Sequence, residues 1–164
     1  MRLMARGAEL VIRVDDRELM SNRLHGSEDA LAELALGRLG AARCEEARVL
    51  VGGLGIGFTL AAALGRLGPG ARVVVAELVP AVVRWNRGPL GEAAGHPLSD
   101  GRVAVHGGDV SELIRYPPAP WDAILLDVDN GPTALTRPSN SWLYGWEGLG
   151  ACFEALSEGG VLGV

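Results

Sequence analysis

The feature that most constrains this chain is a glycine cluster between a short apolar run and a helix pattern. Residues 49–51 are apolar, glycines stand at Gly53, Gly55 and Gly57, and residues 60–67 are good helix formers. Glycine takes positive φ and lets a ligand approach the backbone, because no Cβ stands in the way. The helix N-terminus offers free N–H groups and a positive dipole end. The stretch therefore predicts a strand, a tight turn and a helix, with a ligand site at the turn.

The spacing of these glycines separates two kinds of nucleotide-binding turn. The dinucleotide fingerprint requires a third glycine three residues after the second, and Phe58 occupies that place. The turn instead resembles the nucleoside-binding turn of folds that bind S-adenosylmethionine. A tight strand-to-helix turn without any ligand remains the alternative.

An acidic residue ends the next predicted strand. Residues 71–76 form a second apolar run, and Glu77 follows it, 20 residues beyond Gly57. A carboxylate at the tip of the second strand can accept hydrogen bonds from both hydroxyls of a ribose lying over the glycine turn. We therefore expect Glu77 to bind ribose.

Two more apolar runs, residues 102–106 and 121–126, also end in carboxylates. Asp109 follows the first run after two glycines, and Asp127 ends the second. Asp109 is suited to accept an adenine amino group or to cap a short helix over residues 111–115, and the residues alone leave both open. Strands that alternate with helices predict an α/β fold with a doubly wound, mostly parallel sheet. Ligands bind outside the carboxyl ends of such strands, where these acids converge.

The N-terminal segment predicts a separate small unit. Residues 9–14 and 17–20 favour a β-hairpin, so we divide the chain into a hairpin at 1–26 and a nucleoside-binding domain at 27–164. The sequence ends inside an apolar strand pattern, from which we expect a domain that is incomplete at its C-terminus.

Several local signals predict where helices begin and end. Ser27 is a candidate cap for a helix whose buried face includes Leu31, Leu34, Ala35 and Leu39. Pro80 is suited to the first residue of another helix. Residues 91–100 are expected to form a loop, and residues 157–160 a turn into a strand over 161–164.

Composition limits the classes of function. The chain has 164 residues, 48% of them hydrophobic, and a net charge of −5, which argues against a nucleic-acid partner and suits a cationic substrate. The chain contains no lysine, so Schiff-base chemistry on a lysine is excluded.

The cysteines and the absence of targeting signals indicate the compartment. Cys44 and Cys152 are far apart and indicate a reducing compartment without a metal site. With neither a signal peptide nor a membrane-spanning run, we expect a cytoplasmic protein without a membrane partner and leave a homodimer open.

Taken together, the motifs resemble the spermidine synthase-like aminopropyltransferases, a branch of the Rossmann-like class I methyltransferase fold. The resemblance spans nearly the whole chain, and it is carried by the hairpin, the glycine turn and three further stretches: residues 75–83, residues 121–132 and the pair Leu143-Tyr144. It implies transfer of an aminopropyl group from decarboxylated S-adenosylmethionine, or a related S-adenosyl donor, to a small amine acceptor, without a metal.

The resemblance also implies roles for individual residues. Glu77 would hold the ribose, Asp109 with Val110 the adenine, and Asp127 would be the catalytic acid. Asp129 or Asn130 would stand at the second acidic position of the same loop. As our own hypothesis for the mechanism, Asp129 holds a distal amine of the acceptor, and Trp142 and Tyr144 form a wall along its methylene chain.

The sequence departs from the family at one position of the glycine turn. The family has an aspartate that contacts the donor amine, and this chain has Ile56 there. Two further hypotheses therefore stand beside aminopropyl transfer. One is methyl transfer from S-adenosylmethionine to a small molecule, and the other is a nucleoside-binding module without catalysis.

Overall fold

A parallel five-stranded sheet forms the centre of the computed structural model, which describes residues 1–7, 9–15, 17–128 and 142–164. Its strands lie in the order β6-β5-β4-β7-β8, and every pair is parallel. Their bounds are β4 Arg48–Gly52, β5 Arg72–Ala76, β6 Val103–His106, β7 Trp121–Leu126 and β8 Leu156–Gly163. The order steps outward from β4 in both directions, as the doubly wound prediction requires, so that prediction is confirmed.

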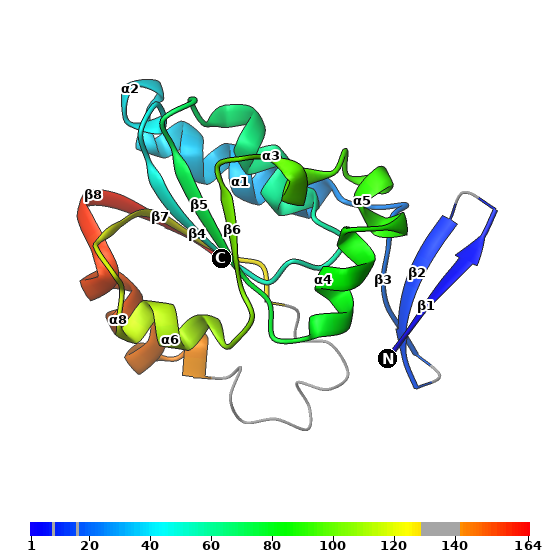
Figure 1. Ribbon diagram of the computed structural model, residues 1–164. Helices are drawn as coiled ribbons and strands as arrows, with labels where there is room; N and C mark the ends of the chain where they lie inside the picture. The colour runs from blue at the N-terminus through cyan, green and yellow to red at the C-terminus, as the bar shows by residue number, and fades with distance from the viewer. Residues whose placement is uncertain (8, 16, 129–141) are drawn as a thin grey trace.

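Helices cover both faces of this sheet (Figure 1). The α-helices are α1 Gly26–Leu39, α2 Ala41–Cys44, α3 Phe58–Arg66, α4 Pro80–Asn86, α5 Pro89–Ala93, α6 Val110–Arg115 and α8 Trp146–Ala155, and a 3₁₀ turn, η1, spans Pro97–Ser99. Helices α1 and α3 lie on one side of the sheet, and α6 and α8 lie on the other.

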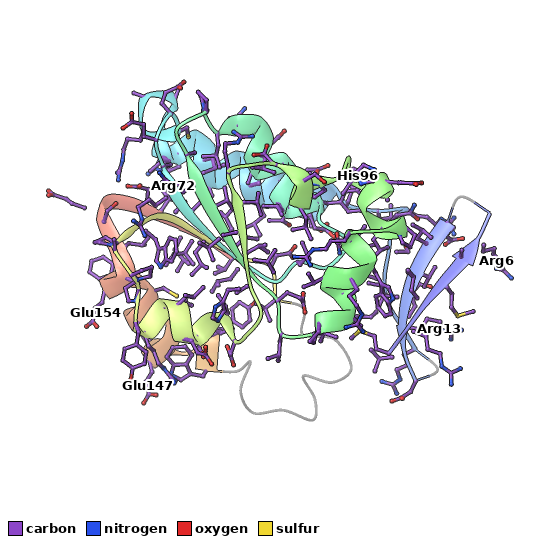
Figure 2. All side chains as sticks on the ribbon, in the orientation of Figure 1. Arg6, Arg13, Arg72, His96, Glu147 and Glu154 are labelled. Carbon is purple, nitrogen blue, oxygen red and sulfur yellow. The ribbon has the colours of Figure 1, made fainter. Side chains whose placement is uncertain are left out.

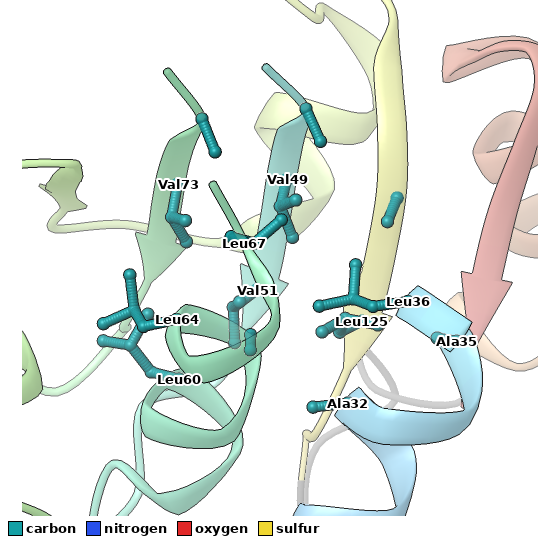
Figure 3. Close-up of a cluster of buried hydrophobic side chains, with 14 of the residues drawn as sticks. Ala32, Ala35, Leu36, Val49, Val51, Leu60, Leu64, Leu67, Val73 and Leu125 are labelled. Carbon is teal, nitrogen blue, oxygen red and sulfur yellow. The ribbon is translucent and has the colours of Figure 1, made fainter. Parts of the chain in front are cut away.

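The alternation of side chains along the strands builds two cores. Val49 and Val51 of β4 and Leu125 of β7 pack with α1 and α3, and this core is drawn in Figure 3. Leu50 of β4 and Ile124 of β7 point to the opposite face and pack with α6 and α8. Because both faces are covered, the inner strands β4, β5 and β7 are apolar at nearly every position, which is why they are recognisable in the sequence. Charged side chains such as those labelled Arg72 and Glu154 lie at the periphery (Figure 2).

The N-terminal segment forms a three-stranded antiparallel sheet rather than a two-stranded hairpin. β2 Glu9–Val14 and β3 Arg17–Ser21 are the predicted pair, and β1 Arg2–Arg6 adds a third strand along β2. β1 is exposed along most of its length, so its sequence carries no apolar alternation that would reveal a strand. Ile12 of β2 is fully buried against Ile56 and Leu90, which fixes the small sheet beside the glycine turn.

Three predictions about the helices and loops need correction. Ser27 does not cap α1: the helix begins at Gly26, and the Ser27 hydroxyl donates to the Oε2 atom of Glu28. Leu34 is 75% exposed, because the buried stripe of α1 runs through Ala32, Ala35, Leu36 and Leu39. Residues 91–100 are not only loop, since they contain the end of α5 and η1, whereas Pro80 does begin α4 as predicted.

The end of the chain also differs from the prediction. β8 begins at Leu156, directly after α8, and a bulge around Gly159 and Gly160 interrupts its pairing with β7.

Cys44 and Cys152 are buried free thiols, and burial raises the pKa of both, that of Cys152 to about 11. Among the described residues, no helix is long and apolar enough to cross a membrane.

Candidate functional site

A cavity of about 190 Å³ opens at the carboxyl ends of the central strands. Seven of the residues singled out in the sequence line it: Gly53, Gly55, Gly57, Glu77, Asp109, Val110 and Asp127. The N-terminal sheet closes another part of the wall with apolar side chains, among them Ile12, Leu19 and Met20. The fold therefore brings these seven residues together at one edge of the sheet.

The three glycines of the turn all have positive φ, at +91°, +51° and +99° for Gly53, Gly55 and Gly57. Side chains rarely adopt such values, so the turn depends on glycine at these positions. At Gly53 the need is also steric, because a Cβ there would overlap the backbone carbonyl oxygen of Asp127. The turn thus packs directly against the end of β7.

Glu77 is held in place by two backbone donors. Its Oε2 atom accepts from the Leu54 N–H at 3.1 Å, and its Oε1 atom accepts from the Val79 N–H at 2.8 Å. The residue is 9% exposed and still lines the cavity. These bonds join the glycine turn to the start of α4 and fix the orientation of the carboxylate, and the carboxylate keeps further lone pairs for a ligand.

Asp109 caps a helix at the edge of the same cavity. Its Oδ1 atom accepts from the Ser111 N–H at 2.9 Å, which makes it the N-cap of α6. The cap alternative from the sequence is therefore present in the structure, and Asp109 also lines the cavity next to Val110. The two roles are compatible, since one carboxylate oxygen serves the cap.

Asp127 lies just beyond β7, and its Oδ2 atom accepts a hydrogen bond from the Thr59 hydroxyl at 2.5 Å. Its backbone N–H donates to the Gly52 carbonyl at 2.8 Å, which continues the pairing with β4. Thr59 is 1% exposed and belongs to the first turn of α3. Sequence reasoning did not single out Thr59, because the pair is 68 residues apart along the chain.

The segment after Asp127 contributes Leu143 to the cavity wall. Trp142 stacks under the guanidinium of Arg115, 4.0 Å from its ring centre, and the Tyr144 hydroxyl donates to the Val128 carbonyl at 2.9 Å. The sequence hypothesis placed Trp142 and Tyr144 against the acceptor. Asp129 and Asn130, the other two residues of that hypothesis, lie outside the described residues.

Asn86 is a second functional candidate that the sequence did not reveal. Its side chain is 1% exposed and donates to the carbonyls of Gly55 and Val82, at 2.8 and 3.1 Å. The amide thereby ties α4 to the middle of the glycine turn. A buried amide that bridges two segments carries no periodic signal that a sequence could show.

All the charged side chains among the described residues that line the cavity are carboxylates. Glu28, Glu77, Asp109 and Asp127 contribute four carboxylates, and this lining includes no arginine or histidine side chain. Across the described part of the chain, no group of three or more histidine, cysteine or acidic residues could hold a metal ion. A cavity with this charge attracts cations and disfavours anions.

Comparison with known proteins adds the fold class. The chain matches no protein-family model and no curated protein. Among solved structures, it is similar to a spermidine synthase bound to the transition-state analogue AdoDATO, with a TM-score of 0.68 and 21% identity over 91% of this chain. The spermidine synthase of Thermotoga maritima gives a TM-score of 0.70 with 22% identity over 91% of this chain.

An O-methyltransferase from Bacillus cereus in complex with SAH is also similar, with a TM-score of 0.55 and 17% identity over 85% of this chain and 56% of its own. The chain spans 46% and 47% of the two spermidine synthases, about half their length. Together these matches show the Rossmann-like fold of the class I methyltransferases, with a small antiparallel sheet before it.

Proposed function

We propose that this domain binds an S-adenosyl-type sulfonium donor and transfers its aminopropyl group to a small amine, as a spermidine synthase-like transferase. The glycine turn and Glu77 would hold the ribose, and Asp109 with Val110 the adenine. The similar spermidine synthase contains the analogue AdoDATO, and both spermidine synthases align over more of this chain than the O-methyltransferase does. The likeness supports the proposal at the level of fold.

The charge of the cavity is the observation that carries this proposal. A decarboxylated donor has a sulfonium and an ammonium but no carboxylate, so it suits a lining with four carboxylates. S-adenosylmethionine adds an α-carboxylate, for which the described lining offers no cationic side chain. An anionic group placed there would lose its hydration without gaining a charged partner.

The chemistry needs a deprotonated amine beside the sulfonium carbon. The amine nitrogen forms a bond to the carbon as the carbon–sulfur bond breaks, and the electron pair of that bond stays on sulfur as a thioether. An alkyl ammonium has a pKa of about 10, so it must lose a proton before it attacks. Asp127 would bind the ammonium at the strand end and take that proton, with water as the final acceptor, and correct placement would contribute more than basicity.

The acceptor side of the site is part of the same proposal. Asp129 or Asn130 would hold the distal amine, and Trp142 and Tyr144 would stand near the methylene chain. In the structure, the Trp142 ring contacts the Arg115 guanidinium, and the Tyr144 hydroxyl donates to the Val128 carbonyl. Leu143 lies between them and lines the cavity, so an acceptor would contact this segment through Leu143.

Methyl transfer is the second candidate, and Ile56 favours it. Ile56 is 4% exposed and packs with Ile12 and Leu90, at the place where the resemblance would have an aspartate for the donor amine. A donor ammonium next to Ile56 would lack that partner, whereas a methyl donor does not need an aminopropyl contact. The acceptor would then be a small molecule at the same edge of the cavity.

Calorimetric titration with two donors tests the proposal. We expect decarboxylated S-adenosylmethionine to bind at least about tenfold more tightly than S-adenosylmethionine, a difference of about 1.4 kcal/mol, because only the latter brings a carboxylate into the acidic cavity. Binding of S-adenosylmethionine alone, with product formation from a methyl acceptor panel, would favour methyl transfer. Binding of methylthioadenosine without turnover of any donor would favour the module without catalysis.

A matched variant connects this binding to the site. Glu77→Gln keeps the shape and one acceptor oxygen for the Leu54 or Val79 N–H, but it removes the charge that would hold the ribose hydroxyls. We expect affinity for methylthioadenosine to fall about tenfold, within the range for loss of charge-assisted hydrogen bonds. Glu77→Ala is the poorer test, because it would also leave two backbone donors without their partner.

A further inference from the structure

The Thr59 hydroxyl is buried and therefore needs a hydrogen-bond partner. Threonine in a helix interior can donate to the carbonyl one turn earlier, but Thr59 lies in the first turn of α3, where that carbonyl precedes the helix. Thr59 is 1% exposed, yet its hydroxyl donates across the structure to the Oδ2 atom of Asp127. The contact joins the first turn of α3 to the end of β7, and Thr59 is therefore part of the site rather than only of the core.

The contact between the Thr59 hydroxyl and the Asp127 carboxyl group is short. The oxygen–oxygen distance is 2.5 Å, and hydrogen bonds of hydroxyls to carboxylates are typically 2.5–2.7 Å long. Thr59 lies in the first turn of α3, so this bond attaches the Asp127 carboxyl group to the N-terminal end of that helix.

The backbone of Asp127 is fixed without help from Thr59. The Asp127 N–H donates to the Gly52 carbonyl at 2.8 Å, and its carbonyl oxygen packs against the Cα of Gly53. The preceding residue, Leu126, is buried in the core of the α6 side. The bond from Thr59 therefore acts on the side chain of Asp127, and other contacts fix the position of its backbone.

The neighbouring charges show why this orientation needs a tether. Glu28, Glu77 and Asp109 line the same cavity, and each repels a second carboxylate through a partly apolar space. Glu77 and Asp109 are held by backbone N–H groups. Loss of the Thr59 hydroxyl would remove one donor from the Asp127 side chain and leave this repulsion in place, so it would favour rotation of the carboxylate towards water.

We propose that Thr59 is a positioning residue, whose hydroxyl holds the Asp127 carboxylate facing the cavity so that it meets a cationic substrate. The assignment rests on the proposed function for its catalytic consequence, but the placement of the carboxylate is a property of the free protein. Thr59 itself does not contact the reacting atoms. It acts on the reaction through the orientation of Asp127.

Three variants separate this role from a packing role. Thr59→Val keeps the branched shape without the hydroxyl, and Thr59→Ser keeps the hydroxyl without the methyl group. Ser157→Ala is the matched control, because it removes a hydroxyl that donates to a carboxylate, Asp122, at the other end of the same strand. The first readout is the carboxyl ¹³C resonance of Asp127, assigned by its loss in Asp127→Asn.

We expect Thr59→Val to move that resonance and to lower kcat with an amine acceptor by about tenfold or more, since misplacement by about 1 Å can cost up to a hundredfold. KM for the donor should stay within about twofold, because the nucleoside contacts are unchanged. Thr59→Ser should restore both the resonance and kcat, and Ser157→Ala should leave both like the parent.

The outcomes distinguish this proposal from the proposed function. An Asp127 resonance that is the same in the parent and Thr59→Val overturns the positioning role, whatever the activity. A parent without turnover on any amine overturns the proposed function, and the resonance still decides the role of Thr59. If Thr59→Ser loses as much kcat as Thr59→Val, the methyl group and not the hydroxyl is what the site requires, and the proposal is wrong.

Discussion

An aspartate lies at each end of β7, and the two carboxyl groups have different surroundings. At the amino end, Asp122 accepts from the Arg43 guanidinium at 2.6 Å, the Ser157 hydroxyl at 2.8 Å and the Arg48 N–H at 2.9 Å. At the carboxyl end, Asp127 accepts from the Thr59 hydroxyl and lines a cavity whose described side chains include no arginine or histidine. Four apolar residues separate the two acids.

The difference shows how position in a parallel sheet decides what a carboxylate does. Asp122 is saturated by donors from α2, β4 and β8, so it joins three elements and has little left for a ligand. Burial raises the pKa of Asp122, but hydrogen bonds from Arg48, Ser157 and Arg43 outweigh burial and bring this pKa below its ordinary value. Asp127 stands at the carboxyl edge of the sheet, where such folds bind ligands, and it lines the cavity there.

The largest expected effect is that of Asp127→Asn on turnover. The amide keeps the shape and can still meet Thr59, but it cannot take a proton or attract an ammonium. We expect turnover with an amine acceptor to fall about a hundredfold or more, within the range for loss of a general base. The assay follows thioether product with a panel of di- and polyamines.

The same variant should keep its fold and its nucleoside site. Removing one of four carboxylates from the cavity lowers their mutual repulsion, so we expect stability that is unchanged or slightly higher, as for other functional groups under strain. Affinity for methylthioadenosine should persist. Turnover equal to that of the parent would show that Asp127 is not the base.

Asp122→Asn should lower stability and leave donor binding unchanged, the reverse of what we expect for Asp127→Asn. It removes the charge that pairs with Arg43 and weakens the acceptor for the Arg48 N–H, and it does not touch the cavity. We expect a loss of about 1–2 kcal/mol in the free energy of unfolding, reduced from the value for a buried pair because the Arg43 guanidinium is partly exposed. Urea unfolding measures the loss, and donor affinity should match the parent. A change in donor affinity with unchanged stability would reverse the roles assigned to the two ends.

Much of this arrangement can be predicted from the sequence, because it follows from continuous local patterns. The three inner strands β4, β5 and β7 are apolar runs that are largely buried, and the glycines at 53, 55 and 57 stand where positive φ is required. Glu77 and Asp127 directly follow such runs. An acid after a buried strand falls at the ligand edge whenever the sheet is parallel, so these residues were accessible to sequence reasoning.

Contacts that depend on tertiary packing were not accessible. The Thr59–Asp127 and Arg43–Asp122 pairs join residues 68 and 79 positions apart, and neither has a local pattern. β1 was missed because its mostly exposed residues show no apolar alternation. Leu34 was placed inside because the sequence of α1 is apolar on several sides, and the packing against α3 and β7, through Ala32 and Leu36, determines which side is buried.

The pH dependence of stability sharpens the comparison. The pKa of Asp122 is lower in the folded protein than its ordinary value of about 4, so its contribution to stability is present above about pH 5 and is lost as the pH falls through the folded pKa. We therefore expect the stability difference between the parent and Asp122→Asn to be greatest near pH 7 and to shrink below about pH 4. Urea unfolding at pH 7, 5 and 3 measures it, and a difference that grows on acidification would contradict the assignment.

Asp100 provides an internal reference for that titration. Hydrogen bonds from the side chain and backbone N–H of Arg102 lower the pKa of Asp100 to about 2. Because the folded pKa of Asp100 is lowered, as it is for Asp122, protonation of Asp100 also lowers the stability of the folded protein. We therefore expect the Asp122→Asn variant still to lose stability as the pH falls towards 2. A variant whose stability does not change with acid would show that Asp122 alone accounts for the loss of stability at low pH.

The smallest expected effect is that of Ser157→Ala. The substitution removes one of the three donors to Asp122 and leaves the Arg43 guanidinium and the Arg48 N–H in place. We expect a loss of about 0.5–1 kcal/mol in the free energy of unfolding, the usual net value of one hydrogen bond, and unchanged turnover. A loss as large as that of Asp122→Asn would mean that the hydroxyl, which also accepts from Arg43, holds the arginine in place. The ion pair and the hydroxyl would then act as one unit, and the double variant Ser157→Ala with Asp122→Asn would be no less stable than either single variant.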